Sequence, residues 1–345
     1  MKTLYLDCGM GAAGDMLTAA LFELLEDSEK ESFLQELNNI GIEDVTFEAE
    51  KSVKCGIVGT HMKVMVGDVE EETHDHDHEH EHHHDHDHEH EHHHDHEHEH
   101  HHGHDHEHEH HHDHDHEHDH EHEHHHGPDH EHEHHHAHHH SSMKDIEDII
   151  NALKVSDRVK ADTIAVYKLI AEAESNAHGV EVSEIHFHEV GTKDAVADVT
   201  AVCMLIEKLG IERVEASNVH VGSGHVHCAH GILPVPAPAT AYILRDVPIY
   251  GGGIKGELCT PTGAALLKHF SKSFGDMPAM TVTGIGYGMG KKDFSAANCV
   301  RAMLGETSNE TDRAGKLEYS DLVALADKYG ITTDDIVRII ENGQH

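Results

Sequence analysis

The chain has 345 residues and a formal net charge of −43, which argues against nucleic acid as its main partner because phosphate backbones are bound by clustered Lys and Arg. It has no run of about 18 apolar residues, so neither a transmembrane helix nor a membrane partner is expected. Residues 1–7 lack the long apolar core of a signal peptide, and the six cysteines form no CxxC pair. These features predict a cytoplasmic protein with reduced thiols.

Much of the charge lies in one segment, residues 74–140, which holds 40 His, 23 Asp or Glu and no Lys or Arg. Acids and imidazoles alternate without an apolar face, so burial cannot offset the entropy of folding, and we predict a disordered insertion. Imidazole and carboxylate bind nickel, copper and zinc. At about four ligands per ion, the segment would hold about ten ions, with His76, His78 and His80 as its first ligands. A repeat expansion without function is the alternative.

The chain before this His-rich tract predicts a small α/β layer. Its expected elements are a strand at 3–7, a glycine-rich turn, a helix at 16–25, a second helix capped by Ser28 and Glu31, and strands at 45–51 and 62–66.

The chain after the tract predicts several helices with clear capping signals. Ser142, Ser156 and Thr192 begin helices that run to about 153, 177 and 209, and Gly179 ends the second. The other expected elements are extended chain at 184–189 and at Pro234 to Pro238, strands at 213–221 and 299–304, a helix at 260–271, and glycine-punctuated chain at 281–290.

The predicted fold class is α/β, with α+β as the alternative: a mixed-sheet body at 1–69 and 143–306 carries the insertion at 74–140. Residues 307–345 are expected to be a linker and a short helical tail. The tail contains two helical patterns, 319–328 and 333–340, and its acidic residues favour a packing hairpin over a DNA-binding helix-turn-helix.

Two histidines and two carboxylates form the first candidate site. In an extended segment, His186 and His188 point to the same face. Asp194 and Asp198 are four residues apart on the following helix, where like charges repel unless a cation lies between them. These four residues predict a metal or catalytic cluster; hydrogen-bonded structural residues are the alternative.

A glycine-rich segment, residues 222–231, contains the second candidate site. His225, His227, Cys228 and His230 place three imidazoles and one thiol within six residues. Nickel accepts both nitrogen and sulfur donors. The three histidines are therefore predicted metal ligands, with a glycine turn that carries incidental histidines as the alternative.

Two turns that precede helices form the third candidate site. Glycines before a helix expose amide N–H groups that can hold phosphate, and Asp7 with Asp15 could hold Mg²⁺ beside it. A tight structural turn is an equally good interpretation. The predicted cofactor-binding residues are Gly11, Gly14, Asp15, Thr260, Thr262 and Gly263.

Several unusual strings occur together in one order: Gly14-Asp15-Met16, His186 to Gly191, Cys228 to Thr240, Thr260 to Ala265 and Gly286-Tyr287-Gly288. By these strings the chain resembles the LarC family, the nickel-insertion proteins of nickel-pincer cofactor biosynthesis. The resemblance covers residues 1–69 and 143–306, and a His-rich insertion in the same place is typical of the family.

The resemblance implies a reaction. Nickel would be inserted into pyridinium-3,5-bisthiocarboxylic acid mononucleotide in a lyase-type, cyclometallase step that uses CTP and Mg²⁺ or Mn²⁺ and makes nickel–sulfur and nickel–carbon bonds. The product would serve lactate racemase and related nickel-pincer apoenzymes. The tract would supply Ni²⁺, the two turns would hold the substrate phosphate, and His188 or Glu189 would be the catalytic base.

The chain departs from the family pattern in two places. Gly9 and Met10 stand where the family usually has Phe-Ser, so a hydroxyl near the proposed phosphate turn is missing. Longer members carry a further C-terminal region linked to nucleotide use, whereas about 40 residues follow residue 306 here. The chain is therefore expected to be the nickel-loading half, which needs a C-terminal partner chain or a longer product for turnover, and a homo-oligomer is expected. A nickel store or metallochaperone without catalysis is the alternative function.

Overall fold

The structure is a computed structural model that describes most of the chain outside the tract. The described residues are 1–67, 69–70, 141–187, 190, 192–228 and 230–307, together with Gly330, Thr332 and Asp335. The tract, the pair His188–Glu189 and the predicted tail helices lie outside the described residues, so what was predicted for them stays a prediction.

A mixed eight-stranded sheet forms the base of the fold. Strand β1 pairs in parallel with β5 and antiparallel with β14, and β13 pairs antiparallel with β14 and in parallel with β3. The predicted α/β class with a mixed sheet is therefore confirmed. In sheet order the strands are β12 (Ser271–Phe274), β5 (Arg213–Ala216), β1 (Lys2–Asp7), β14 (Cys299–Glu306), β13 (Thr281–Met289), β3 (Ile57–Val66) and β2 (Val45–Lys54), with β4 (Val69–Glu70) beside β3.

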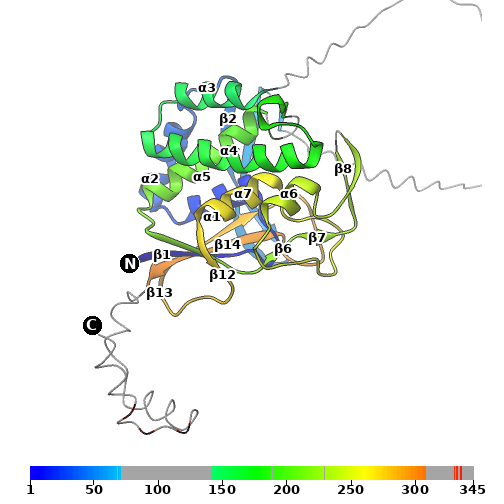
Figure 1. Cartoon of the computed structure of the whole chain (residues 1–345). Coiled ribbons are helices and arrows are strands. Elements are labelled where there is room, and N and C mark those ends of the chain that lie inside the picture. The colour runs from blue at the N-terminus through cyan, green and yellow to red at the C-terminus, as the bar shows by residue number, and fades with distance from the viewer. Residues whose placement is uncertain are drawn as a thin grey trace, which may run out of the picture. The chain divides into compact units, whose positions relative to one another are not determined.

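Helices cover one face of this sheet in two layers (Figure 1). Helices α1, α5 and α7 contact the strands, while α4 packs on α5, α6 and α7, and α3 packs on α4. The helices are α1 (Gly14–Glu23), α2 (Asp27–Leu37), α3 (Met143–Ala152), α4 (Asp157–His178), α5 (Lys193–Lys208), α6 (Pro238–Ile243) and α7 (Pro261–Phe270), with the 3₁₀ turn η1 (Val182–Glu184). Along the chain, the segment from α5 to α7 also forms three short two-stranded pairs. They are β6 (Val219–His220) with β10 (Ile249–Tyr250), β7 (Gly222–Ser223) with β11 (Gly256–Glu257), and β8 (His225–Cys228) with β9 (Gly231–Pro234).

The capping signals of Ser142 and Ser156 are confirmed, whereas Thr192 occupies the N-cap of α5 without a capping side-chain hydrogen bond. The side chain of Ser142 accepts from the backbone N–H of Asp145, whose own side chain accepts from the backbone N–H of Ser142, which completes a capping box. Ser156 caps α4 in the same way, and Gly179 ends it in the left-handed conformation with φ 68°.

Some sequence predictions were wrong at element level. Helix α2 begins at Asp27 with Glu26 as its N-cap, so Ser28 does not cap it; acids in the first turn favour the helix dipole instead. The predicted strand at 213–221 is split, because the chain leaves the sheet after Ala216. The proline segment does not stay extended: Pro238 occupies the first turn of α6, where a missing N–H costs nothing. Residues 281–289 form a full strand.

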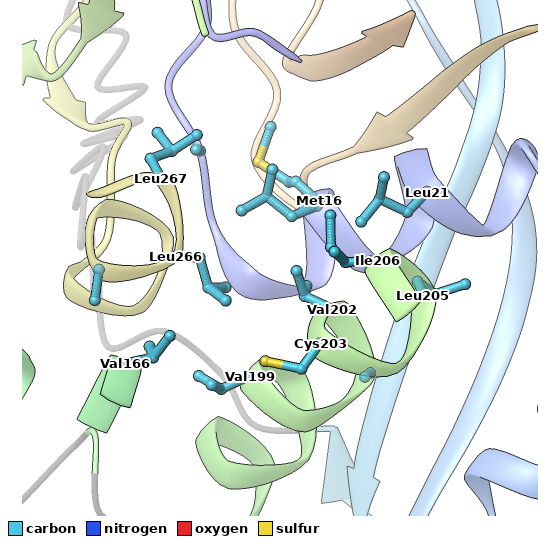
Figure 2. Close-up of a cluster of buried hydrophobic side chains, with 14 of the residues drawn as sticks. Met16, Leu21, Val166, Val199, Val202, Cys203, Leu205, Ile206, Leu266 and Leu267 are labelled. Atoms are coloured by element: carbon cyan, nitrogen blue, oxygen red, sulfur yellow. The ribbon is translucent and has the colours of Figure 1, made fainter. Parts of the chain in front are cut away.

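The core extends from the sheet through α1, α5 and α7 to α4, and Figure 2 shows the part that lies among these helices. Met16 and Leu21 of α1 are directed toward Val202 and Ile206 of α5, and Leu266 of α7 faces the same space. Helix α1 is buried along almost its whole length. An all-round apolar helix is stable only when it is packed on every side, and here the sheet, α5 and α7 surround it.

Strand β13 approaches α1 more closely than side chains would allow. A Cβ atom on Gly286 would lie 2.1 Å from the carbonyl oxygen of Ala20, and one on Gly288 would lie 1.8 Å from that of Met16. The Gly286-Tyr287-Gly288 string therefore lets the strand backbone touch the helix backbone.

Candidate functional site

One cavity of about 510 Å³ lies at the N-terminal ends of α1, α5 and α7. This volume is within the range of about 300–1,000 Å³ that small-molecule sites usually occupy. The N-terminal ends of α1, α5, α6 and α7 border it, as do the C-terminal end of α4, the β8–β9 hairpin, strand β3 and the chain after β13. Its ionisable or metal-binding lining residues are Asp15, Glu174, His178, Asp194, Asp198, His227, Cys228, His230, Glu257, Lys291 and Lys292.

The two carboxylates predicted to share a helix face both line this cavity. Asp194 and Asp198 project from the first turns of α5. The Oδ1 atom of Asp194 is buried and has no hydrogen-bond partner among the residues that the structure describes. A Cβ on Gly14 would lie 2.8 Å from Asp198 Cβ, so the glycine lets α1 and α5 meet at this point. A buried carboxylate oxygen without a donor is costly unless a cation reaches it.

The histidines predicted beside these carboxylates are not all in the cavity. His186 is exposed and does not line it, whereas the next residue, Phe187, is buried against Tyr167 with ring centroids 6.1 Å apart. His188 lies outside the described residues, and so does Glu189. Val190, which follows them, lines the cavity.

The β8–β9 hairpin brings a second group of predicted residues to the cavity. His227, Cys228 and His230 line it, and His225 is exposed outside it. The His230 ring lies 4.8 Å from the ring of His178, at the end of α4.

Glu174 and His178 were missed by the sequence analysis. The Nε2 atom of His178 lies 3.4 Å from Glu174 Oε2, one helical turn earlier. Their i,i+4 spacing at a helix end was a signal that could have pointed to them. We name the cavity-lining set Glu174, His178, Asp194, Asp198, His227, Cys228 and His230 the donor wall. In the described chain, no three His, Cys, Asp or Glu residues converge closely enough to hold a metal ion by themselves.

Backbone amides of the glycine turn before α1 already donate hydrogen bonds within the protein. The N–H of Gly11 donates to Cys8 O at 2.9 Å, and the N–H of Ala12 donates to Leu258 O at 3.0 Å. Gly11 has φ 82°, and a Cβ there would lie 1.9 Å from Leu258 O. Gly11 thus allows a close backbone contact and does not line the cavity.

The turn before α7 has a similar arrangement. Thr260 accepts from the N–H of Gly263 at 3.2 Å, and a Cβ on Gly263 would lie 2.1 Å from Ala12 O. Thr260 and Thr262 line the cavity, as do Gly14 and Asp15 on α1, but Gly263 does not.

The two predicted magnesium ligands occupy different surroundings. Asp7 does not line the cavity; its Oδ2 lies 2.6 Å from Arg301 Nη2, and its Oδ1 accepts from the N–H of Gly9. Asp15 does line it, and burial raises the pKa of its carboxyl group, an effect that His61, the N–H of Met16 and Lys291 partly oppose. The structure thus does not bring Asp7 and Asp15 together.

A basic group that the sequence analysis missed lies on the strand side. The carboxylate of Glu70 accepts from Lys291 Nζ at 2.9 Å and contacts His61 Nε2 at 3.2 Å, and the other ring nitrogen of His61 lies 3.0 Å from Met289 O. Both neighbours of the His61 ring are acceptors, so both ring nitrogens can donate only when the ring is protonated. Burial would raise the pKa of Glu70, but these hydrogen bonds lower it overall.

The six cysteines are free thiols. Burial raises the pKa of Cys8 and Cys259 far above the usual range, so these two thiols are poor nucleophiles and poor metal ligands. Cys228 alone lines the cavity among the six. None of the helices described here is long and apolar enough to cross a membrane.

Comparison with known proteins identifies the family. The sequence model of a family described as "Nickel insertion protein" matches residues 4–320. A pyridinium-3,5-bisthiocarboxylic acid mononucleotide nickel insertion protein of Clostridium acetobutylicum is 37% identical over 313 residues, which is 90% of this chain and 66% of the relative. Proteins of the same name in Clostridium kluyveri and Desulfitobacterium hafniense are 35% identical over 321 residues (92% and 64%) and 43% identical over 171 residues (50% and 42%).

The chain spans just under two thirds of the length of the Clostridium relatives that it matches. No solved structure matches it. The family match nevertheless extends over most of the chain and includes every residue that lines the cavity. The chain belongs to the nickel insertion protein family.

Proposed function

We propose that this chain inserts nickel into pyridinium-3,5-bisthiocarboxylic acid mononucleotide, the activity that the names of its relatives state for those proteins. The observation that carries the proposal is the cavity, in which imidazole, thiol and carboxylate donors share one space with two lysines. Nickel and the mononucleotide are both substrates of the proposed reaction, and the chemistry of the lining suits each of them.

The donor wall suits nickel. Imidazole nitrogen and thiolate sulfur are good nickel ligands, and carboxylates add negative charge. Asp194 contributes a buried oxygen that lacks a hydrogen-bond donor in the described chain. Because no three protein donors converge on one point there, we propose that the sulfur atoms of the mononucleotide complete the coordination of the ion.

The proposed reaction releases one proton. The ring C–H bond breaks as the nickel–carbon bond forms, and a base of the protein accepts the proton. We propose His188 or Glu189 for this role, because the residues on either side of the pair are fixed at the site: Phe187 is buried against α4, and Val190 lines the cavity.

The His-rich tract is proposed to supply the nickel. It is joined to the body at two places near the cavity. Before the tract, Glu70 is held by the cavity-lining Lys291. After it, the carbonyl of Ser141 accepts from the N–H of Phe187 at 3.0 Å, three residues before the cavity-lining Val190.

The family resemblance also implies CTP and Mg²⁺ or Mn²⁺. Asp7 and Asp15 do not fit a shared magnesium site, because Asp7 is paired with Arg301 outside the cavity. We therefore derive no step through these groups, and we propose that a polypeptide corresponding to the rest of the longer relatives provides for nucleotide use. A nickel-pincer apoenzyme would receive the product, and the soluble lyase is proposed to work in the cytoplasm as a homo-oligomer.

The test is a reconstituted reaction. Purified protein is incubated with Ni²⁺, the unmetallated mononucleotide, CTP and Mg²⁺, with and without the C-terminal region of a longer relative, and the product is measured by mass spectrometry. Formation of the nickel adduct in either mixture is the expected result. If no adduct forms in either mixture while nickel is bound, the chain is a nickel store or metallochaperone, the function that the tract alone would favour.

A second experiment separates the tract from the cavity. Replacement of residues 74–140 by a short Gly-Ser linker should remove most of the bound nickel, about ten ions by ligand count. The thermal transition should remain, because every described helix and strand lies outside the tract. Loss of the transition would contradict the assignment of the tract as a supply segment.

A further inference from the structure

The charges around the cavity are unevenly distributed. Five carboxylates line it, two from α5 and one each from α1, α4 and β11. Lys291 and Lys292 are the only Lys or Arg residues among its described lining residues. An anionic group of a ligand would be repelled by these carboxylates, so the two adjacent lysines are where it would bind with least repulsion.

Side-chain hydrogen bonds fix the backbone of Lys291 and Lys292. The ammonium of Lys54 donates to the carbonyl of Lys291 at 3.0 Å and lies 2.6 Å from Asp293 Oδ1, and only 11% of its side chain is exposed. The buried side-chain amide of Asn298 donates to Lys292 O at 2.9 Å, and its backbone carbonyl accepts from the N–H of Gly290. We call residues 289–293 the lysine segment. Fixing it in advance lowers the entropy that a ligand must overcome on binding.

A carboxylate links the lysine segment to strand β3. Glu70 is shared by Lys291 and by His61, whose two ring nitrogens both face acceptors.

The amides of the glycine turns are engaged within the protein. The amides of Gly11, Ala12 and Gly263 all donate to atoms of the protein, as described above. Gly11 and Gly263 also do not line the cavity. A phosphate at these turns would meet amides that are already used.

We propose that Lys291 and Lys292 bind the phosphate of a pyridinium mononucleotide, and that its ring then extends toward the donor wall. The ligand class rests on the proposed function; the position of its phosphate rests on the geometry of the lysine segment. This orientation places the phosphate at the basic end of the cavity and the metal-binding groups of the ring near the imidazoles and carboxylates.

The test compares two ligands that differ by the phosphate alone. Nicotinate mononucleotide, a pyridinium mononucleotide with one ring carboxylate, and its nucleoside are titrated calorimetrically into the full chain. The variants are Lys291→Met with Lys292→Met, the conservative pair Lys291→Arg with Lys292→Arg, and Lys272→Met as a control, an exposed lysine on β12 outside the cavity.

The expected result is a loss of about tenfold or more in mononucleotide affinity in the methionine pair, with nucleoside affinity unchanged. The arginine pair should recover most of the affinity, and the control should match the wild type. Equal weakening of both ligands, no weakening of either, or a wild-type chain that does not prefer the mononucleotide would overturn the assignment.

The reconstituted reaction distinguishes this inference from the proposed function. If the methionine pair forms the nickel adduct with an unchanged KM for the precursor, the phosphate assignment fails while the function stands. If the wild type binds the mononucleotide through the lysines but forms no adduct, the function fails while the phosphate site stands.

Discussion

The donor wall and the lysine segment border the same cavity but are built differently. The lysine segment is held by hydrogen bonds from Lys54 and Asn298. The donor wall comes from helix ends and a short hairpin, and no three of its donors meet at one point in the described chain. Under the two proposals above, the lysine segment would receive an anion at a site that is already formed, whereas the donor wall would be completed by the ion and the mononucleotide.

The substitution with the largest expected effect should displace both the donor wall and the lysine segment, and it should lower the stability of the fold. A Cβ on Gly288 would lie 1.8 Å from Met16 O, so Gly288→Ala should force β13 away from α1. We expect a loss of about 3 kcal/mol and a melting temperature lower by about 6–12 °C. Gly253→Ala, whose Cβ would meet nothing within 4 Å, is the matched control. Equal melting temperatures for the two variants would contradict the close backbone contact.

The next prediction addresses the donor wall alone. In the chain without residues 74–140, Asp194→Asn combined with Asp198→Asn should weaken nickel binding about 100-fold, because ligand oxygens are lost from the wall. Asp148→Asn, an exposed change on α3, should have no effect. The methionine pair at 291 and 292 should also leave nickel affinity unchanged. Isothermal titration with nickel would measure all three, and equal weakening by both pairs would remove the distinction between the regions.

A pH change should act on the donor wall through its imidazoles. Nickel needs the neutral ring, and His178, His227 and His230 are all at the cavity. In the chain without the tract, nickel affinity should fall about tenfold between pH 7.5 and pH 5.5, because protons compete with nickel for the imidazole nitrogens. A competition titration with a chromogenic chelator would measure it. Affinity that does not change over this interval would exclude the histidines as ligands.

The smallest expected effect is on stability and concerns Asp15, whose pKa is lowered in part by the charges of His61 and Lys291. Burial raises its pKa in the folded chain, so the folded state binds this proton more tightly than the unfolded state does. The ionised group therefore reduces stability as the pH rises above the ordinary Asp value. Asp15→Asn should raise the melting temperature at pH 7 by about 2 °C or more.

The difference between Asp15→Asn and wild type should disappear below about pH 4, where Asp15 is protonated in both states. A scanning calorimetry series from pH 3.5 to 7.5 would test the sign. If the variant is less stable at pH 7, the carboxylate is stabilised by its cationic neighbours more than burial opposes it.

Local signals in the sequence predicted much of the helical body. Ser142 and Ser156 cap their helices as expected because capping needs only residues within one turn. The strand at 281–289 was hidden by its glycines, which are unfavourable in an isolated strand. They are required here because α1 lies against them, a contact that joins segments far apart in the chain.

In the candidate site, too, local spacing predicted some residues, while others depend on contacts between distant segments. Asp194 and Asp198 could be found because their spacing places them on one helix face. The sequence alone could not identify the group of Lys291, His61 and Glu70. These residues come together only because β3, β4 and the end of β13 are neighbours in the fold, which no local pattern shows. Asp7 was a reasonable metal ligand in isolation, and only the antiparallel register that sets it opposite Arg301 shows its ion-pair partner.

The glycines of β13 also fix the separation between the lysine segment and the start of α1. The lysine segment starts at Met289, the last residue of that strand, while Asp15 and the glycine that meets Asp198 begin α1. Backbone contact between the strand and the helix leaves no side-chain layer that could be repacked to a different thickness. The spacing between the lysine segment and the start of α1 is thus set by main-chain atoms.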